Sequence, residues 1–548
     1  RDLHSFPTRR SSDLGLAITL ACVMGVSLIG CSTPGKTSTK ENDEKKEKVF
    51  RYSMLTDVTT LDPQKCNELL SSTIGYHIGE GLTRSIDGEV HSGIAESWDV
   101  SEDGLTYTFH LRDAKYSDGE TIKAQDFEYA MKRLVDPETA STFAFIAKPL
   151  ENADEVTAGT KQPNELGVKA VDDKTLECTL GFPAPYFLQI LSMPQFYPTR
   201  QEIVEEYENE FAANGDKNVY SGPFCLKEWK QNDRIILEKN PEYWDKDAIH
   251  LDRVEILIVS DENTALAMFE SGELDYVNVP TDAVANYADA EFYKSGAEDF
   301  IKINTGEEPM SNRNFRLALN YGLNRKEFIK LSTNDVYEAA QRFVLPEVGG
   351  VEKTFGEEYP YEAFPIEGDV DLAKEYLAKA MEEMQIGDPC EIEVELLTSD
   401  TERTKKEAEV IQALLQDALG ITIHVNLVPR ADRLSREDSG NYQMVVSGIQ
   451  PDYPDPISFL ESWETTSPYN HTNYSNPDYD ALLQEAYQSG DAKHRMDTLA
   501  EAEKVFMEDG GLVPLQYRRN AKLVNKDVTG ITNYFCGYDL NFMYGDVK

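Results

Sequence analysis

Stretches with strand-like alternation and stretches with helical spacing follow one another along the chain. Residues 107–111 read YTFHL, in which every second side chain is apolar, and the turn signal SDG follows at 117–119. Over residues 124–134 the apolar side chains fall at helical spacing: Phe127, Ala130, Met131 and Leu134. The first pattern predicts a half-buried strand and the second a helix with one apolar face. Further strands are expected at 235–237 and 254–259.

The clearest succession of elements lies between residues 371 and 428. A helix should open with an acidic cap near Asp371, with an apolar stripe formed by Leu372, Tyr376, Leu377, Ala380, Met381 and Met384. A strand (392–396), a helix (401–419) and a strand (421–428) follow. This order is a βαβ unit, which predicts a mixed or parallel sheet covered by helices. With a long last helix over 493–508, the predicted fold class is α/β.

Composition and charge exclude several kinds of partner. The chain has 548 residues, more than one ordinary domain, so two or three lobes are expected. Hydrophobic residues make up 40% and aromatic residues 10%, enough to fill large cores. The 53 Lys and Arg face 98 Asp and Glu, a net charge of −45. Such a polyanion repels nucleic acid and anionic lipid, so we expect a neutral or cationic small solute as ligand.

The N-terminal segment is typical of a protein that is exported and stays attached to a membrane. Residues 15–30 carry no charge, which suits the apolar part of a signal peptide but is short for a membrane span. They end in the sequence LIGC at 28–31, which resembles a lipoprotein lipobox, so Cys31 would carry a diacyl anchor. A chance Cys after an apolar run, as Cys22 is, is the alternative. Residues 31–48 then form a flexible tether, because no aliphatic or aromatic side chain follows Cys31 there.

The first fourteen residues do not fit this pattern. Arg1–Leu14 reads RDLHSFPTRRSSDL, without Met, and its last ten residues resemble a translated sequencing adapter. We interpret 1–14 as an artefact of sequence assembly and leave it out of the fold prediction. A genuine basic start of a signal peptide is the alternative.

Motifs for covalent chemistry are missing from the sequence. HExxH, GxSxG and P-loop patterns do not occur, and no two of the 8 His lie within four residues of each other. None of the 7 Cys forms a CxxC pair, and five remain if Cys22 leaves with the signal and Cys31 is lipidated. We therefore predict no catalytic residue, cofactor, metal site or disulfide framework, and a secreted hydrolase is disfavoured.

A series of short blocks runs from about residue 50 to residue 543. The blocks are TLDP (60–63), GIAESW (93–98), YTFHLR (107–112), YSDG (116–119), AQDF (124–127), VDPETAS (135–141), SGPF (221–224), KNPEYW (239–244), ESGELD (270–275) and DYPDP (452–456) with Phe459 and Leu460. Each block alone is common. Together, in this order and spacing, they resemble the substrate-binding proteins of peptide/nickel-class ABC transporters, family 5, and most of all the oligopeptide-binding branch.

The resemblance implies a two-wing fold like that of periplasmic binding proteins, of the class C type, with a ligand cleft and a hinge. Lobe I would comprise 49–79, 203–303 and 518–548, lobe II 80–202, and lobe III 304–517. It also implies an extracytoplasmic, monomeric binding protein and not an enzyme. Short peptides would be bound between the lobes and handed to the transmembrane subunits of an ABC permease, with the lipid anchor as the membrane contact.

The resemblance assigns the peptide ammonium to Asp452. This residue follows the apolar run 444–446, at the end of an expected strand, where ligand sites of α/β folds gather. A carboxylate enclosed without a partner costs several kcal/mol, so a ligand ammonium would relieve that cost. A Pro-bounded turn whose Asp caps the next helix is the alternative, and Asp455 suits that role better.

Other positions match the family's ligand-lining segments. Asn67 and Leu69 would line the cleft through the main chain, Phe143 would place an aromatic ring against the ligand, and Tyr453 adjoins Asp452. Ile449 replaces a Trp found in some oligopeptide binders.

Two further stretches bear on ligand length and side-chain preference. Phe300-Ile301-Lys302 stands where some relatives have a Tyr-rich run, and with Ile449 it removes aromatic surface, so these preferences can differ. Three basic residues lie near the position where the family binds the peptide carboxylate: Arg430, Arg433 and Arg436. The alternative is that each is a solvated charge on the surface of a helix.

Related binding proteins of the superfamily take nickel chelates, haem or oligosaccharides. Metal chelates and sugars lack an ammonium group, so the match at Asp452 favours peptides. A receptor that senses peptides without importing them would share every motif. The sequence leaves peptide length, side-chain preference and affinity open.

Overall fold

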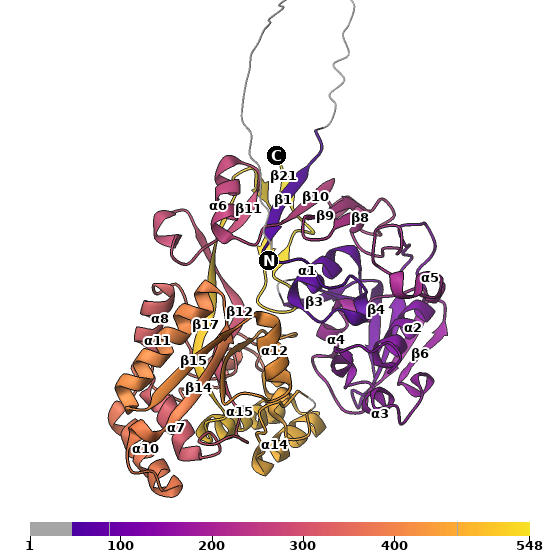
Figure 1. Cartoon of the computed structure of the whole chain (residues 1–548). Helices are drawn as coiled ribbons and strands as arrows, with labels where there is room; N and C mark the ends of the chain where they lie inside the picture. Colours follow the sequence, from indigo (N-terminus) through magenta and orange to yellow (C-terminus); the bar gives the residue numbers. More distant parts are fainter. Residues whose placement is uncertain (1–45, 87, 468) are drawn as a thin grey trace, which may run out of the picture. The chain divides into compact units, whose positions relative to one another are not determined.

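The computed structural model describes residues 46–86, 88–467 and 469–548, and Glu47–Lys548 form one compact unit (Figure 1). The segments 1–14 and 15–30, Cys31 and the tether up to residue 45 lie outside the described residues. Within the described part of the chain, no helix is both long enough and apolar enough to cross a membrane.

One mixed sheet runs through much of the unit, in the order β15-β14-β16-β12-β17-β11-β1-β10-β9-β8, with β13 paired to β17. Its strands other than β12 and β17 are β1 (Val49–Met54), β8 (Phe224–Lys230), β9 (Arg234–Lys239), β10 (Arg253–Ile258), β11 (Tyr276–Val279), β13 (Glu338–Ala339), β14 (Glu393–Ser399), β15 (Thr422–Val428) and β16 (Met444–Ile449). β1 is parallel to β10 and β11, whereas β9 and β8 are antiparallel. Strands at both 235–237 and 254–259 were predicted, and both are confirmed.

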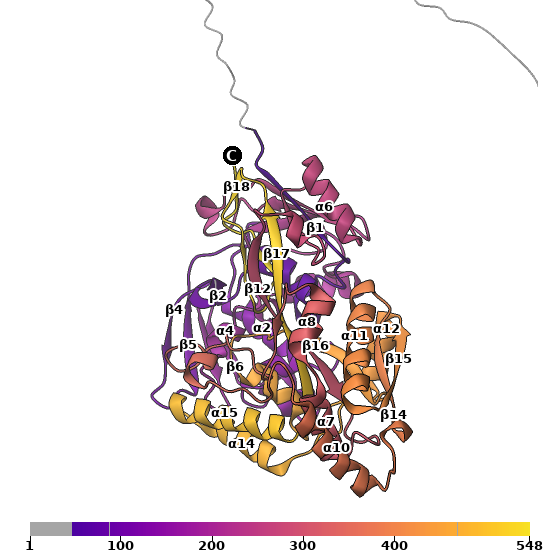
Figure 2. The ribbon, with the colours of Figure 1, turned by 90° about the vertical axis from the view of Figure 1, so that its left-hand side faces the viewer.

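Two long antiparallel strands, β12 (Glu291–Ile303) and β17 (Leu512–Val524), join the halves of this sheet. β12 pairs with β16 on one side, and β17 pairs with β11 on the other. Each strand has 13 residues, so each extends about 40 Å. Figure 2 shows them side by side down the middle of the view. Bending of these two strands would turn one half of the sheet relative to the other, as a hinge requires.

The predicted βαβ unit is confirmed. β14 and β15 pair in parallel, from Glu393 opposite Thr422 onwards, and α11 (Glu402–Leu419) connects them. The predicted helix before this unit is α10 (Val370–Met384), and the acidic cap expected near Asp371 is Asp369, whose Oδ1 accepts the N–H of Leu372 at 3.0 Å. Asp371 lies inside the first turn instead, because a capping residue must keep an extended backbone just outside the helix.

Residues 80–202 build a smaller antiparallel sheet in the order β4-β5-β7-β6 and a hairpin of β2 and β3. The strand and helix predicted at 107–111 and 124–134 are β5 (Thr106–Leu111) and α2 (Ala124–Val135). Phe127, Met131 and Leu134 are fully buried, as the helical spacing predicted. The other strands of this region are β2 (Thr83–Ile86), β3 (Glu89–Ser92), β4 (Ala95–Val100), β6 (Val168–Asp172) and β7 (Thr175–Thr179).

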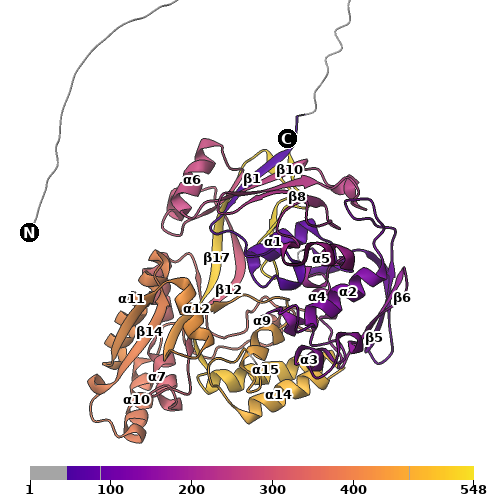
Figure 3. The same ribbon diagram turned by 45° about the vertical axis from the view of Figure 1, so that its right-hand side comes forward.

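Helices α14 (Pro477–Gln488) and α15 (Ala492–Glu508) lie close to residues 80–202, and the rings of Tyr487 and Phe182 are 5.4 Å apart (Figure 3). The prediction of a helix over 493–508 is confirmed. The remaining α-helices are α1 (Leu69–Ile78), α3 (Ala153–Thr157), α4 (Phe187–Ile190), α5 (Gln201–Tyr207), α6 (Glu262–Ser271), α7 (Arg313–Gly322), α8 (Arg325–Thr333), α9 (Phe355–Glu358), α12 (Arg430–Asp438) and α13 (Ile457–Leu460).

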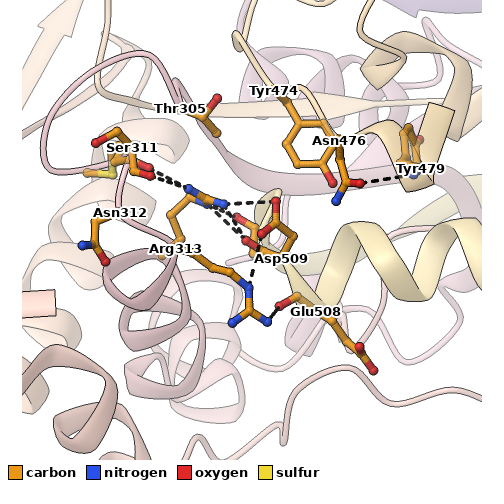
Figure 4. A network of polar contacts seen from close by, with 12 residues as sticks. Thr305, Ser311, Asn312, Arg313, Tyr474, Asn476, Tyr479, Glu508 and Asp509 are labelled. Atoms are coloured by element: carbon orange, nitrogen blue, oxygen red, sulfur yellow. Dashed lines mark hydrogen bonds and ion pairs between the residues drawn. The ribbon is translucent and has the colours of Figure 1, made fainter. Parts of the chain in front are cut away.

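A polar network ties the end of α15 to α7. Arg313 donates to the carbonyl of Glu508 at 2.6 Å, and its Nε lies 3.2 Å from the Asp509 carboxylate (Figure 4). Arg316 forms a second ion pair with Asp509 at 3.2 Å. Since β17 begins three residues after Asp509, this network fixes where the second long strand starts.

Candidate functional site

The segment that follows β16 is held by residues 535–536, which are distant in sequence, and by the nearby Ser458. Gln450 donates from Nε2 to the carbonyl of Phe535 at 3.3 Å, and the Cys536 thiol donates to the carbonyl of Pro451 at 3.3 Å. The N–H of Asp452 donates to Ser458 Oγ at 3.1 Å. The strand end predicted to carry the ligand residue is therefore fixed by the Gln450 side chain and by main-chain groups of Pro451 and Asp452, and none of these contacts involves the Asp452 carboxylate.

The Asp452 carboxylate is half-buried and lacks a cationic partner. In the described part of the chain, no Lys, Arg or His nitrogen lies within 4.0 Å of it. Burial raises its pKa to about 7, with the negative charge of Glu461 as the second cause. A carboxylate with this pKa favours the approach of a cation, because the cation restores the stabilisation that water no longer supplies.

Tyr453 and Asp455 hold the segment in place. Tyr453 is buried, its ring stacks on Tyr186 at 4.7 Å, and its hydroxyl donates to Glu461 Oε1 at 3.1 Å. Asp455 accepts the N–H of Ile457 at 3.0 Å, so it takes the turn role that the sequence suggested. It also binds Arg495 through two contacts of 2.8 and 2.9 Å, a buried ion pair that the sequence did not indicate.

Asn67 and Phe143 come from distant segments and lie near each other. Asn67 Nδ2 donates to Thr142 Oγ1 at 2.7 Å, and the Tyr469 hydroxyl donates to the Thr142 carbonyl at 2.9 Å. The Phe145 ring lies 4.8 Å from Phe143 and 4.6 Å from Tyr469. Three segments therefore meet here: the residues before α1, residues 142–145, and the loop before α14. Leu69, the first residue of α1, is half-buried two positions after Asn67.

Ile449 is the last residue of β16 and pairs with Glu298 of β12. It is half-buried and packs against the large core that residues 80–202 share with the region of α14 and α15. Glu298 itself is fully buried, and neither of its carboxylate oxygens has a hydrogen-bond partner within the described residues. Burial, followed by the charge of Glu503, raises its pKa well above the usual value. No sequence pattern indicated this buried acid without a hydrogen-bond partner in β12.

Two of the three basic residues expected near the peptide carboxylate already form ion pairs within the chain. Arg433 pairs with Glu437, whose Oε1 also lies 2.6 Å from Lys302 Nζ. Arg436 donates to the carbonyl of Asn441 at 3.1 Å and pairs with Glu395. Arg430, at the start of α12, is exposed.

An α/β fold with an unpaired carboxylate where a strand leaves the sheet is typical of a solute-binding protein. Residues 89–471 match the model of the bacterial extracellular solute-binding proteins, family 5. The chain is 33% identical to the dipeptide-binding protein DppE of Bacillus subtilis, over 96% of this chain and 97% of the relative. The chain therefore belongs to family 5 of the bacterial extracellular solute-binding proteins, which are extracytoplasmic binding proteins and not enzymes.

Two solved structures of peptide-binding proteins share this fold. OppA of Listeria monocytogenes bound to peptide is 28% identical, with a TM-score of 0.81 over 92% of this chain and 99% of that one. The unliganded open form of the murein tripeptide-binding protein MppA is 26% identical, with a TM-score of 0.69 over 88% and 94%. The fold of this chain thus matches the peptide-bound structure with the higher TM-score.

Proposed function

We propose that the protein binds short peptides between its lobes and delivers them to an ABC-type import permease. The observation that carries the proposal is the half-buried Asp452 carboxylate without a cationic partner in the described chain. A peptide always offers an ammonium group, whatever its side chains are. A fixed carboxylate that accepts charge-assisted hydrogen bonds is therefore the simplest general receptor for peptides.

Binding would stabilise the closed arrangement by joining the lobes. Asp452 belongs to the predicted lobe III, Asn67 to lobe I and Phe143 to lobe II, so one ligand that touches all three favours closure. The ligand shifts the equilibrium only by its higher affinity for the closed state. The names of the relatives support peptides as the ligand class, since one is a dipeptide-binding protein and another is an oligopeptide-binding protein bound to peptide.

The attachment and the partner follow from the same proposal. A lipidated Cys31 would hold the monomeric protein at the outer face of the cell membrane, and the tether to residue 48 would let it reach the permease. No covalent chemistry would take place on this chain. The test of the anchor is the variant Cys31→Ala in the gene with its natural start, which should move the protein from the membrane pellet to the soluble fraction.

Native mass spectrometry of the unit 47–548, purified without refolding, tests the ligand class. We expect a ladder of co-purified masses that fits peptides of roughly two to six residues. A single mass of a nickel chelate, haem or oligosaccharide would replace the peptide proposal with that ligand. Deletion of the neighbouring permease genes, followed by uptake of a labelled peptide, separates import from a purely sensing role.

A further inference from the structure

A second carboxylate, Glu461, adjoins the residue that follows Asp452. Glu461 opens the short 3-10 helix Glu461–Trp463 and is half-buried. Its Oε1 accepts the Tyr453 hydroxyl at 3.1 Å, and Tyr453 is held by its stacking on Tyr186. The position of Glu461 is therefore set by the same contacts that fix the segment of Asp452.

The nearest cation does not neutralise Glu461. Lys148 Nζ lies 3.7 Å from Glu464 Oε2 and 4.2 Å from the centre of the Tyr487 ring. Across the described residues, Glu461 forms no ion pair with any Lys, Arg or His within 4.0 Å. The other carboxylate of this region, Asp455, is matched by Arg495. Lys148 thus pairs with Glu464, and Asp452 and Glu461 are left without an ion-pair partner among the described residues.

The two unpaired carboxylates share one environment. Burial raises the pKa of Glu461 to about 7, although Lys148 and the Tyr453 hydroxyl counteract the shift. Tyr469 lies close enough to both acids to be affected by them. Burial raises its pKa to about 12, and the negative charges of Glu461 and then Asp452 add to this rise. The Tyr469 hydroxyl is in turn fixed on the carbonyl of Thr142 at 2.9 Å. Two carboxylates enclosed near aromatic rings are costly unless cations enter with the ligand.

We propose that Glu461 selects peptides whose first residue is lysine or arginine. Asp452 receives the terminal ammonium, and Glu461 receives the cation of the first side chain. This inference rests on the proposed peptide-binding function and adds the substrate class to it. The partly exposed ring of Tyr469 suits the apolar stem of such a side chain, because long cationic side chains bury their methylene groups along apolar surface.

Titration calorimetry with two matched peptides tests the inference. The peptides are lysyl-alanyl-alanine and norleucyl-alanyl-alanine, which differ at the side-chain ammonium. We expect the wild-type chain to bind the lysyl peptide at least about tenfold more tightly, as one charge-assisted contact allows. In Glu461→Gln this preference should vanish, with the norleucyl peptide bound as tightly as by the wild type or more tightly. Glu461→Asp, which keeps the charge, should retain part of the preference.

Glu501→Gln is the matched control, because Glu501 is an exposed glutamate of α15 and its loss changes the net charge equally. It should leave the preference within about twofold. If the wild type binds both peptides equally, or if Glu461→Gln keeps the preference, the inference about Glu461 is wrong while peptide binding stands. If the wild type binds neither these peptides nor co-purified ones, the proposed function is wrong and this inference falls with it.

Discussion

Tyr186 stacks its ring on Tyr453, with the ring centres 4.7 Å apart and the planes inclined by 14°. Tyr186 belongs to residues 80–202, whereas Tyr453 immediately follows Asp452 and is buried. Arg495, the partner of Asp455, lies 5.3 Å from the centre of the Tyr186 ring. The residue next to the proposed ammonium site is therefore held by the predicted lobe II, so we expect the position of Asp452 to depend on closure.

The variant Tyr186→Ala should weaken this coupling. A stacked ring pair contributes about 0.5–1.5 kcal/mol beyond its buried area, so we expect peptide affinity to fall roughly two- to tenfold. Small-angle scattering should show a larger radius of gyration for the ligand-free variant than for the wild type. Tyr186→Phe keeps the ring and should behave like the wild type; a loss of affinity there would point to the hydroxyl instead.

Peptide affinity should depend on pH with a maximum between about 7 and 8. The pKa of Asp452 is about 7 before ligand binds, so protonation below that pH removes the carboxylate that the ammonium needs. Above about pH 8 the peptide α-amino group loses its own proton. Calorimetry from pH 5.5 to 9 measures both limbs, and an affinity that does not change between pH 5.5 and 7 would contradict the role of Asp452.

Glu298 should make the wild-type protein less stable as pH rises. Its folded-state pKa is raised well above the usual value, so its contribution is fully present below the unfolded pKa and is lost as pH rises toward the folded one. Glu298→Gln should therefore unfold at nearly the same temperature as the wild type near pH 4.5 and at a higher temperature at pH 8. Thermal unfolding at both pH values measures this, and a less stable variant at pH 8 would show that the acid is ionised.

His77 should make the wild-type protein less stable as pH falls, the opposite of the effect of Glu298. Its Nδ1 lies 2.6 Å from the Thr73 carbonyl, and its Nε2 accepts the N–H of Phe542 at 3.0 Å, which requires the neutral ring. Burial lowers its pKa to about 4. The contribution is present above the unfolded pKa of about 6.5 and is lost as pH falls toward 4. In His77→Gln, the urea-derived free energy of unfolding should fall less between pH 7 and 5 than in the wild type.

The elements that the sequence predicted correctly depend on local pattern. The βαβ unit from Glu393 to Val428 follows from a change of apolar period from two to about three and a half, which neighbouring residues alone determine. The acidic cap expected near Asp371 is Asp369, because the two residues carry the same side chain and only the backbone distinguishes which one caps α10. Local pattern thus identifies elements better than their ends.

The candidate site was predictable only where a motif carried it. Asp452 was identified through the family resemblance and the strand before it, and its ligand role remains a prediction. The pairing of Asp455 with Arg495 joins residues 40 positions apart, and the isolation of Glu298 depends on packing from several elements. Glu461 carried no signal either, because one Glu among 98 acidic residues is uninformative until its neighbours are known.

The central claim is that Asp452 receives the ammonium of a bound peptide. Titration of one peptide and its N-acetylated form against the wild type and Asp452→Asn tests this most directly. We predict that acetylation lowers wild-type affinity more than about tenfold, that Asp452→Asn lowers affinity for the free peptide by a similar factor, and that acetylation then has no further effect. Equal binding of the free and acetylated peptides by the wild type would contradict the account.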